Sequence, residues 1–311
     1  MKIGIIGSGA VGAACAMATI MRGCASELVI VNRGRDRAKG MATDMDYGAP
    51  LSSTTKVTDG DYSDLAGAAL VMVTVGVNEK TGGATDRSDP LGRLRLLDKN
   101  AEVYRQVIPL INAAARDAVL LVVTDPPDPL AYLTRELAGH DRVLSTGTLL
   151  DSLRFRVHLG RKLKVAPIDI EAQVLGEHGT SQIFHWSAAR VGGVPIADAL
   201  EQSGQQHEDD LRTTIENEVR YANITIIEGI GASQYGIGMV CARIAEIVLR
   251  DERAVAPIGV YNSKLRVTLS LPSVVGRKGC LQVLNPPLSN DERIGLEKCI
   301  ETLRKAQERI R

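Results

Sequence analysis

The feature that most constrains the fold of this chain is a glycine-rich turn near its start. Residues 7–12 read Gly-Ser-Gly-Ala-Val-Gly, directly after the apolar run Lys2–Ile6 and at the beginning of Val11–Met21, which is rich in small residues. The apolar run predicts a buried strand, and the second run predicts a helix that packs closely on it. A strand, a glycine turn and a helix in this order are typical of the first unit of a doubly wound α/β sheet.

The remainder of the first half repeats this alternation. Short runs rich in β-branched residues predict strands, and longer charged patterns predict helices, at Leu28–Val31, Arg35–Asp46, Leu70–Val75, Leu91–Ala115 and Val119–Thr124. Parallel strands need a crossover connection between them, usually a helix. We therefore predict a Rossmann-type, doubly wound parallel sheet with helices on both faces.

After about residue 147 the pattern changes. Long helical patterns and hairpin-like apolar segments follow one another at Ser152–Arg161, Gln173–Leu175, Glu208–Glu228, Met239–Arg250 and around Val260–Val275, and Asn290–Ile310 predicts a closing amphipathic helix. This texture is typical of an α+β fold. We expect a dinucleotide-binding domain over residues 1–146 and an α+β substrate domain over residues 147–311.

The composition argues against several classes of protein. The 37 Lys and Arg residues balance the 37 Asp and Glu residues, so no overall field attracts nucleic acid or an anionic membrane. The five cysteines include no Cys-x-x-Cys pair, which argues against a disulfide framework and a zinc site. The sequence has no leader-like segment and no apolar run of membrane-spanning length. We expect a cytoplasmic protein that uses no metal.

The glycine turn itself predicts a bound dinucleotide. Gly7 allows the tight turn, Gly9 lets a pyrophosphate approach the backbone, and Gly12 permits close contact between helix and strand. Ala10 and Val11 open the helix whose N-terminus faces the phosphate charge. The alternative is a glycine-rich turn without a ligand, which the position directly after the first strand disfavours.

The end of the second predicted strand bears on which dinucleotide binds. NAD-binding folds generally carry an Asp or Glu there for the ribose hydroxyls, whereas this chain has Asn32, followed by Arg33. An Asn does not repel a 2′-phosphate, and a guanidinium group binds phosphate bidentately. The sequence therefore predicts a preference for NADPH over NADH. The alternative is that these arginines, with Arg35 and Arg37 nearby, are surface residues without a role.

A second motif carries the candidate chemistry. Gly176-Glu177-His178-Gly179, read with Asp151 and Arg154 upstream, combines an imidazole, a carboxylate to orient it and a guanidinium to hold an anion. The unperturbed pKa of an imidazole lies near neutral pH, which suits proton transfer. If Ser152–Arg161 is helical, Asp151 and Arg154 project to neighbouring positions on one face. These groups indicate hydride transfer to or from a small 2-oxo or 2-hydroxy acid; the alternatives are a structural His and a surface ion pair.

These motifs resemble the lactate/malate dehydrogenase family, closer to its lactate dehydrogenase branch, over essentially the whole chain. The combination of Leu150–Arg154 with Gly176–Gly179 is the most specific part of the likeness. The resemblance implies that His178 is the catalytic acid/base, that Asp151 fixes its tautomer and that Arg154 clamps the substrate carboxylate. The matching stretches are Gly7–Gly12, Asp44–Gly48, Arg93–Asn100, Thr146–Arg156, Gly176–Gly179, Tyr235–Gly238 and Glu252–Tyr261.

The resemblance also implies roles for residues elsewhere in the chain. Counted back from Asn100, Arg93 matches the lid arginine that polarises the substrate carbonyl, but the stretch from Gly76 to Arg93 is several residues longer than usual, so Arg87 is a rival. Ser233 matches the residue beside the substrate side chain. Gly76, and Ile237 on the nicotinamide face, complete the implied cofactor site. A homodimer or homotetramer is implied as well.

Two departures from the family affect the expected substrate. The lid residue that separates lactate from malate is Glu79 when counted forward from Gly76, or Asp86 when counted back from Arg93. Either acid repels a second substrate carboxylate, so we expect a monocarboxylic 2-oxo acid, including one with a polar or cationic side chain. Asp125 stands where the family places an Asn that touches the substrate oxygen and the cofactor ribose.

An Asp at this position lacks the amide donor and brings negative charge toward a developing alkoxide. We therefore expect Asp125 to affect the choice of substrate, with an imine as one possibility. The leading interpretation is a hydride transfer between NAD(P)(H) and a small 2-hydroxy/2-oxo monocarboxylic acid. A malate dehydrogenase and a non-catalytic dinucleotide-binding protein on the same fold are the alternatives.

Overall fold

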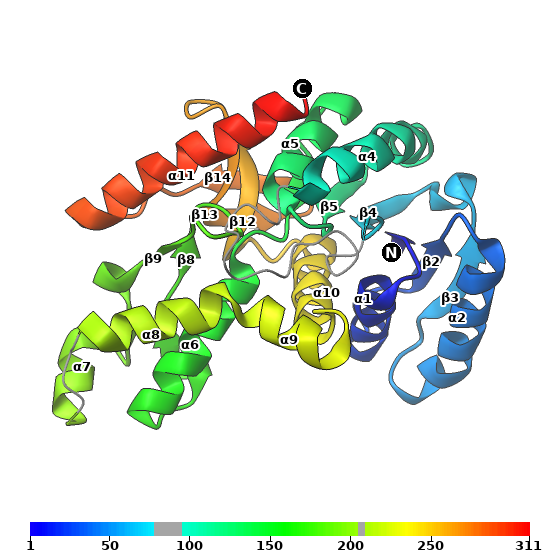
Figure 1. The fold of residues 1–311 in the computed structure, drawn as a ribbon. Coiled ribbons are helices and arrows are strands. Elements are labelled where there is room, and N and C mark those ends of the chain that lie inside the picture. Colours follow the sequence, from blue (N-terminus) through cyan, green and yellow to red (C-terminus); the bar gives the residue numbers. More distant parts are fainter. Residues whose placement is uncertain (78–94, 205–208) are drawn as a thin grey trace.

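The computed structural model describes residues 1–77, 95–204 and 209–311 (Figure 1). Its main element is a nine-stranded sheet with the order β14-β13-β12-β6-β5-β4-β1-β2-β3. The six strands of the first half pair in parallel. They are β1 (Lys2–Ile6), β2 (Glu27–Val31), β3 (Lys56–Gly60), β4 (Ala68–Val73), β5 (Val119–Val122) and β6 (Val143–Ser145). The order reverses between β1 and β4, which confirms the predicted doubly wound fold.

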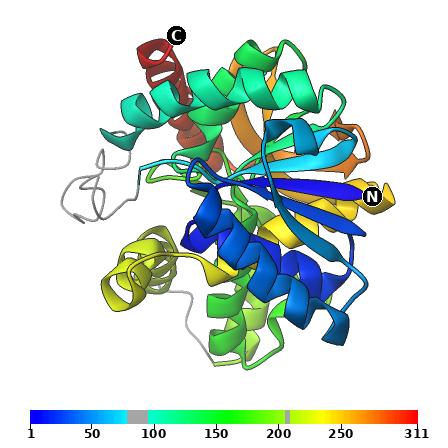
Figure 2. The same ribbon diagram turned by 90° about the vertical axis from the view of Figure 1, so that its right-hand side faces the viewer.

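Helices cover both faces of this sheet (Figure 2). Successive side chains of a strand point to opposite faces, so Ile3 and Ile5 of β1 join one buried cluster and Ile6 joins another. The first cluster lies under α1 (Ala10–Arg22), α2 (Arg35–Gly48) and α10 (Tyr235–Arg250). The second lies under α4 (Arg95–Ala114), α5 (Pro127–Ala138) and the end of α11 (Asn290–Arg309). Burial on both faces explains why β1, β2, β4 and β5 are almost wholly apolar, whereas the edge strand β3 is mostly polar.

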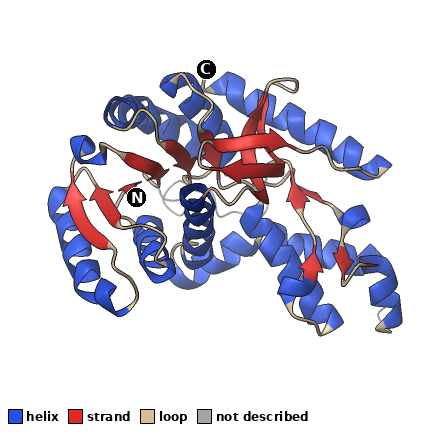
Figure 3. Ribbon diagram, turned by 180° about the vertical axis from the view of Figure 1, so that it is seen from behind, coloured by secondary structure: helices blue, strands red, loops and turns tan. Residues whose placement is uncertain are grey.

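The second half of the chain adds antiparallel strands to the same sheet. β12 (Ala254–Asn262), β13 (Val267–Gly276) and β14 (Gly279–Val283) form a meander, and Gly259 of β12 pairs with Ser145 of β6. Two small sheets lie beside it (Figure 3): β7 (Ile170–Glu171), β10 (Arg190–Val191) and β11 (Val194–Pro195) form one, and β8 (Val174–Leu175) and β9 (Ile183–Phe184) form the other. The remaining α-helices are α6 (Leu149–Leu163), α7 (Ile196–Gln202), α8 (Asp209–Arg220) and α9 (Ala222–Ile230).

Some expected elements differ from the structure. The long pattern at 208–228 forms two helices rather than one, because Tyr221, with φ −106° and ψ 10°, separates α8 from α9. The sequence reading did not anticipate β3, β6 or α5. Short 3₁₀ turns occur at Ala49–Leu51, Tyr62–Leu65, Pro167–Asp169 and Trp186–Ala188. Within the described ranges, no helix has both the length and the apolar character needed to cross a bilayer.

Candidate active site

The turn between β1 and α1 has the close contacts that a nucleotide loop requires. Gly7 has a φ of 113°, in the left-handed region that favours glycine, and its N–H donates to the carbonyl oxygen of Val31 over 2.8 Å. A Cβ atom at Gly12 would overlap the carbonyl oxygen of Gly7. Only glycine therefore lets α1 approach the end of β1 this closely.

The outer side of the same turn is open. Among the described residues, a Cβ atom at Gly9 would meet no heavy atom within 4 Å, and no side chain caps the N-terminus of α1. The hydroxyl oxygen of Ser8 is buried without a hydrogen-bond partner among the residues that the structure describes. A pyrophosphate uses open backbone N–H groups and a helix N-terminus in such loops, so these residues fit the expected dinucleotide.

At the end of β2, Asn32 braces the glycine turn. Its Oδ1 accepts from the backbone N–H of Ser8 over 3.3 Å, and its Nδ2 donates to the carbonyl oxygen of Gly34 over 3.0 Å. Of the nearby arginines, Arg35 binds Asp59 and Arg37 donates to the Ser8 carbonyl oxygen, at 3.1 Å and 2.9 Å respectively. Arg33 is exposed and, within residues 1–77, 95–204 and 209–311, contacts no ionic or hydrogen-bonding partner.

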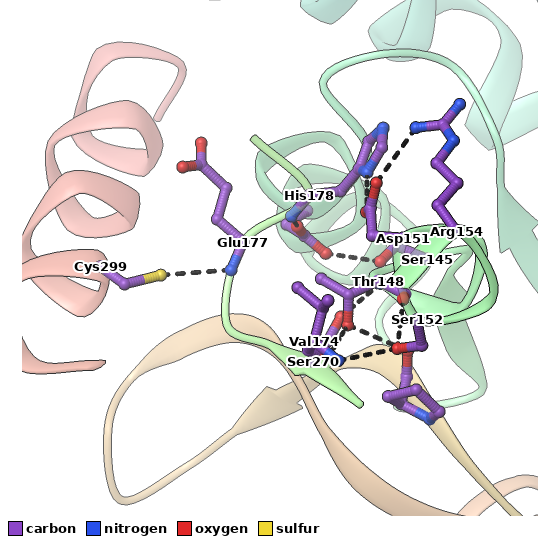
Figure 4. Close-up of polar contacts among 12 residues, drawn as sticks. Ser145, Thr148, Asp151, Ser152, Arg154, Val174, Glu177, His178, Ser270 and Cys299 are labelled. Carbon is purple, nitrogen blue, oxygen red and sulfur yellow. Dashed lines mark hydrogen bonds and ion pairs between the residues drawn. The ribbon is translucent and has the colours of Figure 1, made fainter. Parts of the chain in front are cut away.

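His178 lies in the loop after β8, and a carboxylate binds its imidazole ring. Its Nδ1 is 2.5 Å from Oδ2 of Asp151, and Nη1 of Arg154 is 3.2 Å from the other oxygen of the same carboxylate (Figure 4). Asp151 is almost fully buried, whereas His178 and Arg154 are partly exposed. One buried carboxylate therefore orients the imidazole and stands beside the guanidinium.

The first turn of α6 is fixed from two sides. Ser152 Oγ accepts from the backbone N–H of Val174 in β8 over 2.9 Å, and the backbone N–H of Thr148 donates to Ser270 Oγ of β13 over 3.1 Å. The helix begins at Leu149, earlier than predicted, so Asp151 lies in its first turn, where the helix dipole favours a carboxylate. Asp151 and Arg154 are therefore mounted on a rigid element.

A cavity of about 240 Å³ joins the nucleotide turn to this group. Nine of the predicted site residues line it: Gly9, Ala10, Val11, Gly76, Asp125, Arg154, His178, Ser233 and Ile237. Five other predicted residues lie near the cavity without lining it. They are Gly7 and Gly12 in the glycine turn, Asn32 and Arg33 directly after β2, and Asp151 behind His178. Glu79, Asp86, Arg87 and Arg93 lie outside the described residues.

The sequence reading missed other residues at the site. Thr146, Leu150 and Asn223 line the cavity, and Asp128 contacts the backbone of His178. Asp128 follows the carboxyl end of β5, the edge where ligand sites of parallel sheets gather, but the run Asp125-Pro-Pro-Asp-Pro129 reads as a plain turn. Among the described residues, no group of three or more His, Cys, Asp or Glu side chains could hold a metal ion.

Comparisons with known proteins point to one family. The family model described as lactate/malate dehydrogenase, NAD binding domain matches residues 1–145, and the lactate/malate dehydrogenase, alpha/beta C-terminal domain matches residues 148–311. The chain is 43% identical over 304 residues to an L-lactate dehydrogenase of Deinococcus radiodurans, covering 98% of this chain and 97% of that protein. It is 39% identical to an L-lactate dehydrogenase of Thermus aquaticus, covering 98% of each.

Solved structures show the same likeness. The ligand-bound crystal structure of the minor L-lactate dehydrogenase from Enterococcus mundtii superposes with a TM-score of 0.92 at 32% identity, covering 100% of this chain and 98% of that one. A lactate dehydrogenase from a deep-sea metagenome library gives a TM-score of 0.90, also at 32% identity, covering 99% and 98%.

Proposed function

The chain belongs to the lactate/malate dehydrogenase family, which confirms the resemblance of its motifs, and from this premise we propose its reaction. The proposed activity is hydride transfer between a nicotinamide dinucleotide and a small 2-hydroxy/2-oxo monocarboxylic acid. One observation carries the proposal: His178, oriented by the buried Asp151, and Arg154 line the same cavity as the glycine turn.

The three residues divide the work at the substrate. Arg154 binds the substrate carboxylate, because a guanidinium matches its geometry bidentately. Asp151 engages Nδ1 of His178, so Nε2 exchanges the proton with the substrate oxygen. A reduced nicotinamide dinucleotide held by the glycine turn would supply the hydride for the carbonyl carbon. In reduction the imidazolium gives its proton to the oxygen as the carbon–oxygen π bond opens, and in oxidation the neutral imidazole takes that proton back.

The decisive experiment replaces His178 by Asn. We expect kcat with 2-oxo acids to fall by roughly 10²–10⁴-fold, while cofactor affinity, measured by fluorescence titration, stays within a few fold. The matched control is His158→Asn, because His158 also pairs with a carboxylate, Glu218 at 2.7 Å, but does not line the cavity. Unchanged turnover in His178→Asn contradicts the proposal. Tight cofactor binding by the wild type with no turnover on any 2-oxo acid favours the non-catalytic alternative.

For the cofactor, we propose a preference for NADPH. Asn32 brings no carboxylate to the end of β2, and Arg33 has no partner among the described residues that a 2′-phosphate would have to displace. The arginines that follow it are engaged within the protein. Comparing kcat/KM for NADPH and NADH tests this preference, and a clear advantage of NADH overturns it.

For the substrate, we propose a single carboxylate, bound by Arg154. The sequence places an acid, Glu79 or Asp86, at the lid position that distinguishes lactate from malate, and Arg93 or Arg87 at the carbonyl. A lid acid repels a second carboxylate. A panel of 2-oxo acids tests this proposal; oxaloacetate as the best substrate contradicts it and supports the malate dehydrogenase alternative.

We also propose that the chain forms a homo-oligomer. Two pairs of large apolar side chains are exposed on helices that pack against each other: Met17 and Met21 of α1, and Tyr235 and Met239 of α10. The members of each pair are four residues apart and share a helix face. Exposed apolar surface of this kind marks contact sites, and a second copy of the chain is the proposed partner.

A further inference from the structure

Asp128 is a buried carboxyl group that the proposed reaction does not use. It lies in the first turn of α5 and is 0% exposed. Its Oδ2 accepts from the backbone N–H of His178 over 2.8 Å, and its Oδ1 accepts from the hydroxyl of Ser145 over 2.6 Å. A buried carboxylate is costly unless its oxygens are hydrogen-bonded, and one of the two donors here is the main chain of the catalytic His.

The loop that carries His178 needs such an anchor. Glycines stand at both of its ends, and Gly176 has a φ of 86°. Gly176 pairs with Ser270 of β13 through two backbone hydrogen bonds of 2.8 Å. The next N–H, that of Glu177, donates to the Sγ of Cys299 at 3.2 Å, a weak acceptor. At His178 itself the backbone anchor is the carboxylate, whose charge-assisted bond is the strongest kind available.

The space around Asp128 is fixed as well. A Cβ atom at Gly259 of β12 would overlap both Asp128 Oδ1 and Ser145 Oγ, so the carboxyl group packs directly against this strand. Among the described residues, the ionisable groups of His178, Glu177 and Cys299 interact electrostatically with it. Burial raises the pKa of Asp128 to about 6, and the bonds from Ser145 and His178 oppose that rise. At neutral pH the group is therefore largely ionised.

We infer that Asp128 is a positioning residue, which holds the backbone of His178 while Asp151 holds its ring. The inference rests on the proposed function. With both ends fixed, Nε2 keeps its place relative to the carboxylate bound by Arg154. Displacement of a reacting group by about 1 Å can cost about 100-fold in rate, so the loss of the backbone anchor slows the chemical step more than it weakens substrate binding.

The test compares three variants of Asp128 with a matched control. Asp128→Ala and Asp128→Ser remove the acceptor from His178, whereas Asp128→Asn keeps the shape and one acceptor oxygen. Glu292, in the first turn of α11, provides the control. Like Asp128, it accepts from a backbone N–H and from a hydroxyl; both belong to Ser187, at 2.9 Å and 2.6 Å respectively. Neither Glu292 nor Ser187 lines the cavity.

We expect kcat of Asp128→Ala and Asp128→Ser to fall by about 10–100-fold, with KM for the 2-oxo acid changed less than about threefold. Asp128→Asn should restore kcat to within about threefold of the wild type. The isotope effect with C4-deuterated reduced nicotinamide should rise in the Ala and Ser variants, since the chemical step has slowed. Glu292→Ala should lose stability but keep kcat.

Two outcomes overturn the inference, each measured on folded protein. One is a loss of kcat that is equal in Asp128→Ala, Asp128→Ser and Glu292→Ala. The other is an unchanged kcat in Asp128→Ser. A measurement without turnover separates this result from a failure of the proposed function. In protein labelled with ¹⁵N-histidine, the ring signals of His178, assigned by their loss in His178→Asn, should broaden or split in Asp128→Ser and not in Glu292→Ala. If the wild type has no turnover, this spectrum alone decides whether Asp128 positions His178.

Discussion

At the scale of single residues, Asp125 has the most direct effect on the expected chemistry. It lines the cavity with His178, and its backbone carbonyl is fixed by Nδ2 of Asn100 at 2.8 Å. Asp125→Asn supplies an amide donor and removes a negative charge near a developing alkoxide. We predict a rise of about tenfold or more in kcat/KM for pyruvate, measured by cofactor absorbance. The exposed Asp117→Asn is the control; a fall on pyruvate would show that the carboxylate itself assists the reaction.

Arg33 is the second residue with a separable role. Arg33→Ala removes the guanidinium proposed to bind the 2′-phosphate, and a charged hydrogen bond contributes about 1.5–3 kcal/mol. We predict that kcat/KM for NADPH falls by about tenfold or more while that for NADH changes little. Adding Asn32→Asp should widen the difference through charge repulsion. Arg116→Ala, at an exposed position away from the turn, controls for loss of surface charge, and equal effects on both cofactors would refute the assignment.

At the scale of elements, the junction of β1 and α1 offers a matched pair of glycines. Gly12→Ala places a Cβ against the Gly7 carbonyl oxygen, whereas Gly9→Ala places one in open space. We predict that Gly12→Ala loses about 1–3 kcal/mol of stability, measured by denaturant unfolding. Gly9→Ala should unfold like the wild type but bind the cofactor more weakly, because its methyl group occupies the approach of the pyrophosphate. Similar unfolding curves for both variants would contradict the packing argument.

The elements also show what the sequence can predict. Apolar runs flanked by glycine or polar residues predicted β1, β2, β4 and β5, because a strand buried on both faces has a nearly continuous run of apolar residues. β6 has only three residues, and α5 begins within a proline-rich run that resembles a turn, although proline is well accepted at the first helical position. β6 is too short to show a period, and in α5 the turn-like prolines at its start conceal a helical spacing of buried residues that begins only at Leu130.

Some residues of the candidate site could also be predicted from the sequence, and others could not. His178, Asp151 and Arg154 were predicted, because they lie in two short sequence motifs, Leu150–Arg154 and Gly176–Gly179. The contact of Asp128 with His178 spans 50 positions of the chain and is made through a backbone N–H. No local pattern encodes such a contact, so only the folded chain shows it.

At the scale of the whole molecule, Asp128 should leave a signature in the pH dependence of stability. Its pKa is raised to about 6 in the folded chain, against about 3.9 in an unfolded one. Between these values the folded chain binds more protons at this group, so its contribution to the free energy of unfolding decreases as the pH rises from about 4 to about 6, by up to about 3 kcal/mol.

Asp128→Asn removes this titration. We predict that the wild type loses stability relative to the variant between pH 4 and pH 6, and that the difference is constant above pH 7. Urea unfolding at a series of pH values measures it, with Asp117→Asn as the reference for an exposed carboxyl group. A difference that does not vary with pH would show that the folded and unfolded pKa values are alike.

Assembly is tested on the same scale. Met21→Glu and Met239→Glu each place a charge among the exposed apolar residues of α1 and α10, where a desolvated charge in an interface is costly. We predict that the wild type sediments or scatters light as an oligomer and that both variants shift toward the monomer. Leu281→Glu, at an apolar side chain of β14 that is exposed to nearly the same extent as Met239, is the control. A monomeric wild type would refute the assembly.

The placement of α10 limits how the chain can be divided. This helix belongs to the C-terminal half, yet its Cys241 and Ile244 complete the apolar layer that contains Ile3 and Ile5. A fragment that stops near residue 146 would leave that layer uncovered in water. We therefore expect a fragment of residues 1–146 to be less stable than the same segment in the full chain, and the nascent chain to complete this apolar layer only after α10 has been synthesised.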